Sequence, residues 1–111
     1  VVLVHAASKS SSGSQAWAGL EIQGDGKIVV GGWAGGAKSL ELALARLTTN
    51  GTLDPTFGSS GVVRDVVSAN DDLPWYGAMS LQSDGKILLG AERRSFPVVG
   101  WIVSRYQTNG A

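Results

Sequence analysis

The sequence has no cysteine and only one histidine, His5. The lack of cysteine excludes a disulfide framework, a thiolate metal site and a cysteine nucleophile, and such a chain fits either redox compartment. A single histidine leaves little material for metal chemistry, so we expect no metal ion and no cofactor. Apolar runs are short. None approaches the roughly 18 residues of a membrane-spanning helix, and we expect no membrane insertion.

An excess of charge of either sign is also missing. Nine Lys and Arg residues balance nine Asp and Glu residues, and the formal net charge is zero. This balance argues against a nucleic-acid-binding surface and against an acidic disordered tail. Proline is scarce at three residues, whereas the 111-residue chain has 16 glycines, four tryptophans and 43% apolar residues. This composition predicts one small globular domain with tight turns between short strands.

The chain contains two copies of one repeat. A shift of 59 residues places residues 16–52 on residues 75–111 without a gap. The identities cluster around an Asp-Gly-Lys-Ile motif and an Arg-x-x-Thr-Asn-Gly motif. Because a fixed period is the signature of a repeat architecture, we expect both copies to share one structure.

Each repeat predicts a series of short strands. Asp-Gly between two apolar runs predicts a β-hairpin with a type I′ turn, which needs positive φ at both central residues. Residues 39–47 are good helix formers, but their equivalents at 98–106 are β-branched and aromatic, so we expect strands at both places. Near-continuous apolar runs indicate strands covered on both faces, as in propeller blades. The expected strands are residues 1–5, 17–23, 27–33, 40–47, 61–67, 76–82, 86–91 and 99–106.

Two long motifs of the repeat resemble a known family. The first is Leu-x-Ile-Gln-x-Asp-Gly-Lys-Ile-Val-Val-x-Gly, and the second is Leu-Ala-Arg-Leu-x-x-Asn-Gly-Thr-Leu-Asp-Pro-Thr-Phe-Gly-x-x-Gly-Val-Val. They are similar to the delta-60 repeat of bacterial proteins. The resemblance covers nearly the whole chain, although residues 9–15 depart from the pattern. It implies tandem blades of a β-propeller in secreted or cell-surface proteins of bacteria.

We therefore expect an all-β fold of two four-stranded antiparallel blades, in a single unit spanning residues 1–111. Residues 1–8 would form the fourth strand of an incomplete blade, residues 16–68 the first repeat, and residues 75–111 a second repeat that lacks its fourth strand. Natural propellers close with roughly four to eight blades. Other copies of the chain, or the remaining blades of a longer chain, are expected to complete the ring, with three copies giving six blades and four giving eight.

Polar residues that recur in both repeats are expected to be architectural. Arg46, which Arg105 repeats, would form a bidentate pair with Asp54, and Phe57 would plug the connection that follows. Trp101 lies within an apolar run and is expected in the core. The surface is the expected place of His5.

Residues that differ between the repeats are better candidates for ligand binding. Aromatic rings at strand ends would stack on a sugar while charged groups bind its hydroxyls, and packing of the same rings between blades is the alternative. The ligand-binding candidates are Trp17, Trp33, Trp75, Tyr76, Glu92, Arg93 and Arg94.

Two other motifs are weaker. Residues 32–39 come within one residue of a phosphate-binding P-loop, but that loop must lead into a helix, whereas the repeat predicts a strand. Residues 70–72 offer two carboxylates to a cation, but a solvated loop is the stronger interpretation because calcium needs several oxygen ligands.

No Ser/His/Asp constellation or matched carboxylate pair stands at a recognisable spacing, so we expect no enzyme. The leading hypothesis is a non-enzymatic extracellular binding or display module, with a lectin-like carbohydrate site as its sharper form. The alternatives are a purely structural scaffold or filament and, more remotely, a glycan-cleaving propeller using Glu92 or Asp71.

Overall fold

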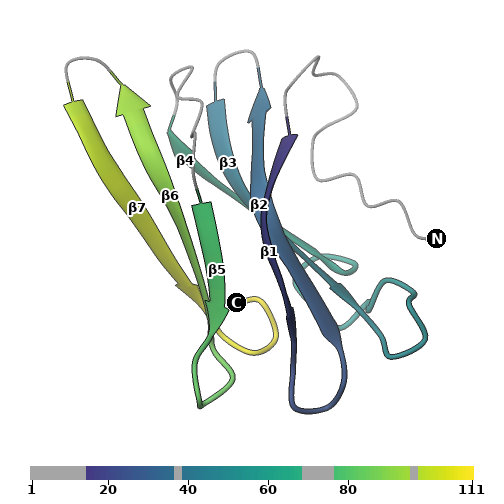
Figure 1. Ribbon diagram of the computed structural model, residues 1–111. Coiled ribbons are helices and arrows are strands. Elements are labelled where there is room, and N and C mark those ends of the chain that lie inside the picture. Colours follow the sequence, from purple (N-terminus) through teal and green to yellow (C-terminus); the bar gives the residue numbers. More distant parts are fainter. Residues whose placement is uncertain (1–14, 37–38, 69–76, 96–97) are drawn as a thin grey trace.

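The computed structural model describes residues 15–36, 39–68, 77–95 and 98–111, and every element in these ranges is a β-strand (Figure 1). The predicted all-β fold is confirmed, including the strand at Ser39–Leu47, whose residues favour a helix. The predicted strand at residues 1–5 lies outside the described residues. The strands are β1 (Gln15–Ile22), β2 (Ile28–Gly36), β3 (Ser39–Leu47), β4 (Val62–Ser68), β5 (Gly77–Leu81), β6 (Ile87–Ser95) and β7 (Val98–Tyr106).

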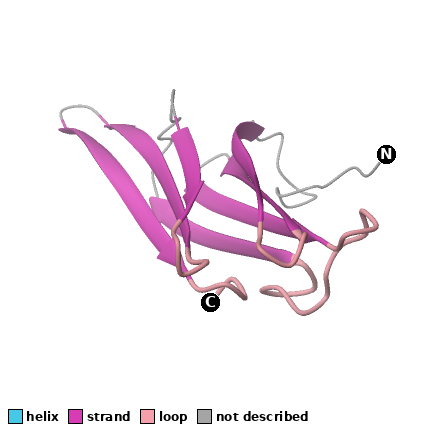
Figure 2. Ribbon diagram, turned by 60° about the horizontal axis from the view of Figure 1, so that its bottom comes forward, coloured by secondary structure: helices cyan, strands magenta, loops and turns pink. Residues whose placement is uncertain are grey.

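The strands form two antiparallel sheets. Sheet A has the order β1-β2-β3-β4 and sheet B the order β5-β6-β7, so neighbours in sequence are neighbours in space. β1 lies beside β5, and the described turns after β1, β3, β5 and β7 gather at one end of the molecule (Figure 2). This meander of up to four strands, repeated side by side, is the arrangement of propeller blades.

The hairpin turns are of another type than expected. Gly26 N donates to Gln23 O at 2.9 Å, and Gln23 N donates to Lys27 O at 2.8 Å. Within this loop only Gly26 has a positive φ, at 84°. The expected type I′ geometry is therefore wrong for Asp25. The loop is a three-residue connection in which one glycine takes the left-handed conformation and forms a bulge.

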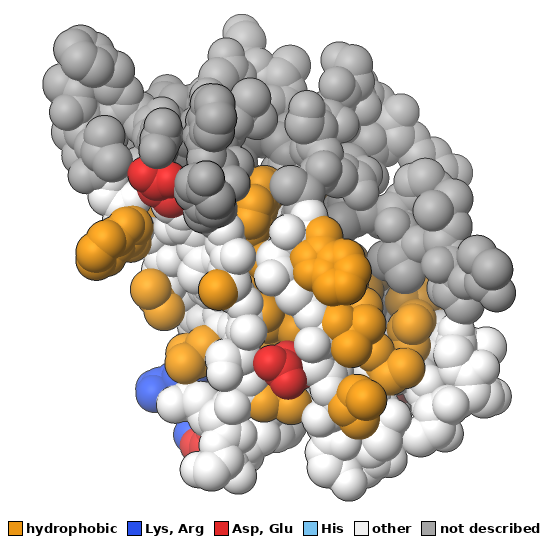
Figure 3. Space-filling view, viewed as in Figure 1, with side chains coloured by type: hydrophobic (Ala, Val, Ile, Leu, Met, Phe, Trp, Pro, Cys, Tyr) orange, Lys and Arg blue, Asp and Glu red, His pale blue; other side chains and the backbone are white. Residues whose placement is uncertain are grey.

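The core lies between the two sheets. Sheet A contributes Leu42 and Leu44, and sheet B contributes Ile87 and Leu89, all of which are fully buried. Alternation along each strand sends one set of side chains inward and the other outward. Both sheets therefore also carry an outward face. Figure 3 shows hydrophobic side chains exposed over both sheets.

Candidate functional site

A buried polar cluster joins the end of β3 to the loop that follows it. We call it the Arg46 cluster. Arg46 is 6% exposed and Asp54 is 2% exposed. Arg46 Nε lies 2.9 Å from Asp54 Oδ2, so the predicted contact between the two residues is present. The cluster comprises the side chains of Gln23, Lys27, Arg46, Asp54 and Thr56.

Only one nitrogen of Arg46 reaches Asp54, so the bidentate fork expected from the sequence is wrong. Nη2 donates to Thr56 Oγ1 at 3.1 Å. Nη1 donates to Gln23 Oε1 at 3.3 Å and to the backbone carbonyl of Thr108 at 2.6 Å. Because Thr108 follows β7, Arg46 ties the first repeat to the end of the second.

Both carboxylate oxygens of Asp54 also have partners. Its Oδ1 accepts from the backbone N–H of Thr56 at 3.0 Å and from the Thr56 hydroxyl at 2.6 Å, and Lys27 Nζ lies 2.9 Å from its Oδ2. The Thr56 hydroxyl, followed by Lys27, holds the pKa of Asp54 well below its usual value of 3.8. Phe57 closes the cluster beneath the guanidinium, 4.6 Å from Arg46 Cζ to the ring centre. These contacts give the cluster an architectural role.

Three members of the cluster, Gln23, Lys27 and Arg46, have the equivalents Gln82, Lys86 and Arg105 in the second repeat, where their side-chain contacts differ. Lys86 pairs with Asp84 at 2.7 Å, and this contact lowers the pKa of Asp84. The Oε1 atom of Gln82 is buried without a hydrogen-bond partner among the described residues. Arg105, expected to repeat the structural role of Arg46, is exposed on β7. Among the described residues, the cluster is thus formed around Arg46 of the first repeat.

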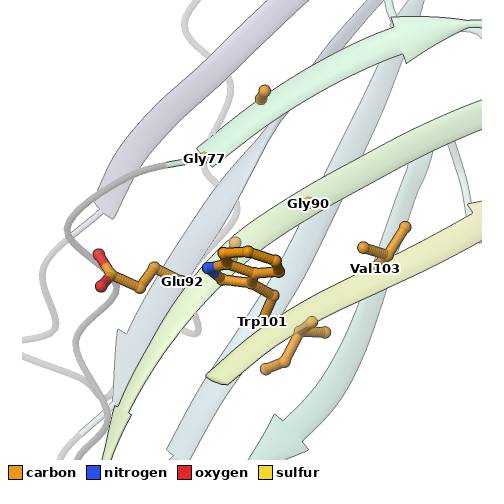
Figure 4. A pocket seen from close by; sticks show the side chains of 8 residues that line it. Gly77, Gly90, Glu92, Trp101 and Val103 are labelled. Carbon is orange, nitrogen blue, oxygen red and sulfur yellow. The ribbon is translucent and has the colours of Figure 1, made fainter. Parts of the chain in front are cut away.

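A hollow of about 570 Å³ lies on the outward face of sheet B (Figure 4). Trp101 and Val103 project from β7 beside it, and Glu92 projects from the paired strand β6. Gly90 and Ala78 form its floor. Its lining is thus mostly apolar, with one carboxylate at the rim.

The structure corrects two expectations about tryptophan. Trp33, proposed as a ligand-binding residue, is 6% exposed, and its ring packs directly over the backbone of Gly77 in the core. Trp101, expected in the core, is 87% exposed. In β7 the alternation sends Ile102 inward and Trp101 outward. Arg105 shares the outward strand face with Trp101, but its repeat equivalent Arg46 shares a buried face with Leu42, so the strand pattern alone does not indicate this orientation.

The remaining candidates are not brought together within the described residues. Trp17 is exposed on the outward face of sheet A, away from the hollow on sheet B. Arg93 and Arg94 belong to β6, but their side chains are not described. Trp75 and Tyr76 lie outside the described residues. Of the three candidates whose side chains the structure describes, Trp17, Trp33 and Glu92, only Glu92 lines the hollow.

The weaker motifs have clear outcomes where the structure describes them. β2 runs to Gly36 and pairs with β3, which begins at Ser39, so the P-loop-like residues join two strands. Residues 70–72 and His5 lie outside the described residues. In the described part of the chain, no three His, Cys, Asp or Glu side chains gather in a way that could hold a metal ion. The same residues include no helix with the length and apolar character needed to cross a membrane.

Comparison with known protein families gives a match. A family model described as "Domain of unknown function (DUF5122) beta-propeller" matches residues 23–57 and 82–111. The matched segments begin at Gln23 and Gln82, which are equivalent positions of the two repeats. No curated protein and no solved structure matches the chain.

Proposed function

The chain belongs to the DUF5122 β-propeller family, and from this premise we propose that it is a non-enzymatic binding or display module that acts outside the bacterial cell. The proposal is supported by a difference in role between the polar residues that the two repeats share and those that differ. Residues shared by the repeats, such as Arg46 and Asp25, serve the buried cluster and the hairpin turns. Residues that differ between the repeats remain for ligand contact.

We further propose a carbohydrate site at one end of sheet B. The observation that carries it is the register of β5 and β6, in which Gly77 pairs with Ala91. Glu92, Arg93 and Arg94 follow Ala91, so they extend past the start of β5. Trp75 and Tyr76 immediately precede Gly77 in the chain. Aromatic rings offer apolar faces to a sugar, and carboxylate and guanidinium groups bind its hydroxyls.

A glycan array tests this proposal. The wild-type chain is expected to bind a subset of glycans, Trp75→Ala to lose at least about tenfold in affinity because the stacking surface is gone, and Glu92→Gln to bind more weakly. Trp17→Ala is the matched control, because it makes the same change on the outward face of sheet A.

Retained binding in Trp75→Ala, or loss confined to Trp17→Ala, would contradict a site at this end of sheet B. A wild-type chain that binds no glycan would contradict the carbohydrate form and favour the purely structural scaffold.

A further inference from the structure

The two blades pack through a contact that depends on glycine. Met79 of β5 lies over β1 and β2 at two glycines. A Cβ atom added to Gly31 would lie 2.5 Å from Met79 Sδ and 3.0 Å from Leu44 Cδ2, and one added to Gly19 would lie 3.1 Å from Met79 Cβ. Real Cβ atoms do not approach neighbours at 2.5 Å, so the bare backbone of Gly31 leaves the room that Met79 fills.

The repeat places an equivalent hollow on the outward face of sheet B. Gly31, Gly19 and Leu44 correspond to Gly90, Ala78 and Val103, which line the open hollow. Among the described residues, a Cβ atom added to Gly90 would meet only two backbone carbonyl oxygens, at 3.7 and 3.9 Å. In the described part of the chain, no side chain covers Gly90 as Met79 covers Gly31.

The repeat also places an equivalent of the Met79 side chain on the outward face of sheet A, and we call this exposed apolar projection the knob. Met79 and Leu81 of β5 correspond to Leu20 and Ile22 of β1. Leu20 is 46% exposed and Ile22 is 64% exposed. Leu20 pairs with Val30, so it points to the opposite side of sheet A from the glycine contact. The knob and the hollow are thus on opposite faces of the molecule.

We propose that a second copy of this chain docks Leu20 and Ile22 into the hollow over Gly90 and Ala78. The chain carries both halves of a contact that it already makes once internally, and soluble monomers rarely leave large apolar patches uncovered. Because the two halves differ, the contact is head-to-tail, and its repetition builds a ring or a filament.

A polar contact supports the same arrangement. Across the internal interface, Arg46 donates to the carbonyl of Thr108. The repeat equivalents of these two residues are Arg105 and Thr49. Arg105 is exposed in the single chain, and the docked copy brings the carbonyl of its Thr49 towards it. The head-to-tail contact therefore provides Arg105 with the kind of acceptor that Arg46 already has.

Sedimentation velocity of the 111-residue chain tests the contact. The wild type is expected to associate in a concentration-dependent way. Gly90→Glu fills the hollow and Leu20→Glu removes the knob, and each is expected to raise the dissociation constant at least tenfold. Ser83→Glu, at an exposed turn, adds the same charge outside both faces and is expected to associate like the wild type. Circular dichroism checks that each variant keeps its strands, since Gly90 has space for a side chain in the single chain.

A mixture of Gly90→Glu and Leu20→Glu tests whether the contact joins two different faces. Gly90→Glu retains Leu20, and Leu20→Glu retains the open hollow, so their equimolar mixture is expected to form one-to-one dimers and nothing larger. A contact between identical patches would not be restored by mixing. Three results would each overturn the proposal. The wild type could stay monomeric even at a concentration 100-fold higher than that used for the variants. Both folded variants could associate as the wild type does, or their mixture could stay monomeric.

Discussion

Asp54→Ala is expected to lower the melting temperature by on the order of 10 °C or more, because breaking a buried ion pair leaves the other charge unpaired. The charge left behind is the Arg46 guanidinium, which is held in place by Gln23, Thr56 and the Thr108 carbonyl. Thermal unfolding followed by circular dichroism measures the loss. Asp25→Ala removes an exposed turn carboxylate 3.9 Å from Lys27 Nζ and serves as the control, with a shift of only a few degrees.

The pH dependence of stability checks the same carboxylate. Its folded pKa lies below the unfolded value of 3.8. Such a group contributes stability above about pH 4, and the contribution is lost as the pH falls towards the folded pKa. The difference in melting temperature between the wild type and Asp54→Asn is therefore expected to shrink between about pH 4 and about pH 2. A difference that stays constant across this range would contradict the charged role of Asp54. Normal melting with loss of ligand binding would move Asp54 into a functional site.

Phe57→Ala is expected to destabilise the chain by about 3 to 5 kcal/mol, the usual cost of removing a fully buried aromatic ring. Phe57 is 0% exposed. It lies beneath Arg46, and its ring atoms come within 3.1 Å of a Cβ position on Gly110 at the end of the second repeat. Its removal therefore loosens both repeats together. Chemical denaturation with urea measures the free energy of unfolding.

Leu53→Ala provides the comparison for Phe57→Ala, because Leu53 is in the same loop but is 39% exposed. It is expected to lower the free energy of unfolding by less than half as much as Phe57→Ala, since less apolar surface leaves the interior. Equal costs for the two variants would contradict the placement of Phe57 as the plug of the connection between β3 and β4.

Much of the fold could be predicted from the repeat. Residues 39–47 alone favour a helix, and only the β-branched equivalent at 98–106 indicates the strand that the structure contains. The Arg46 and Asp54 contact was also predictable, because both belong to one motif. The bond from Arg46 to the Thr108 carbonyl was not, because it joins residues 62 positions apart and depends on how the blades stack.

The placement of the aromatic residues could not be predicted from their position in the strands. Trp33 and Glu92 are equivalent in the repeat, yet Trp33 is in the core and Glu92 lines an open hollow. The reason is that sheet A has sheet B packed against this face, whereas the same face of sheet B has no neighbour among the described residues. Repetition predicts which residues share a face, but the burial of that face depends on whether another blade covers it.

Disulfide cross-linking tests most directly the claim that the outward faces pair as the inward faces do. The chain has no cysteine, so an introduced pair of cysteines has no native cysteine with which to form a competing disulfide. Gly19→Cys with Met79→Cys should close within one chain, because their Cβ positions lie 3.1 Å apart and need to separate by only a few tenths of an ångström to reach the about 3.5 to 4.5 Å of a disulfide. The equivalent pair, Ala78→Cys with Leu20→Cys, is predicted to cross-link separate copies into covalent oligomers under oxidation. Intramolecular closure of the first pair with only monomer from the second would contradict the head-to-tail contact.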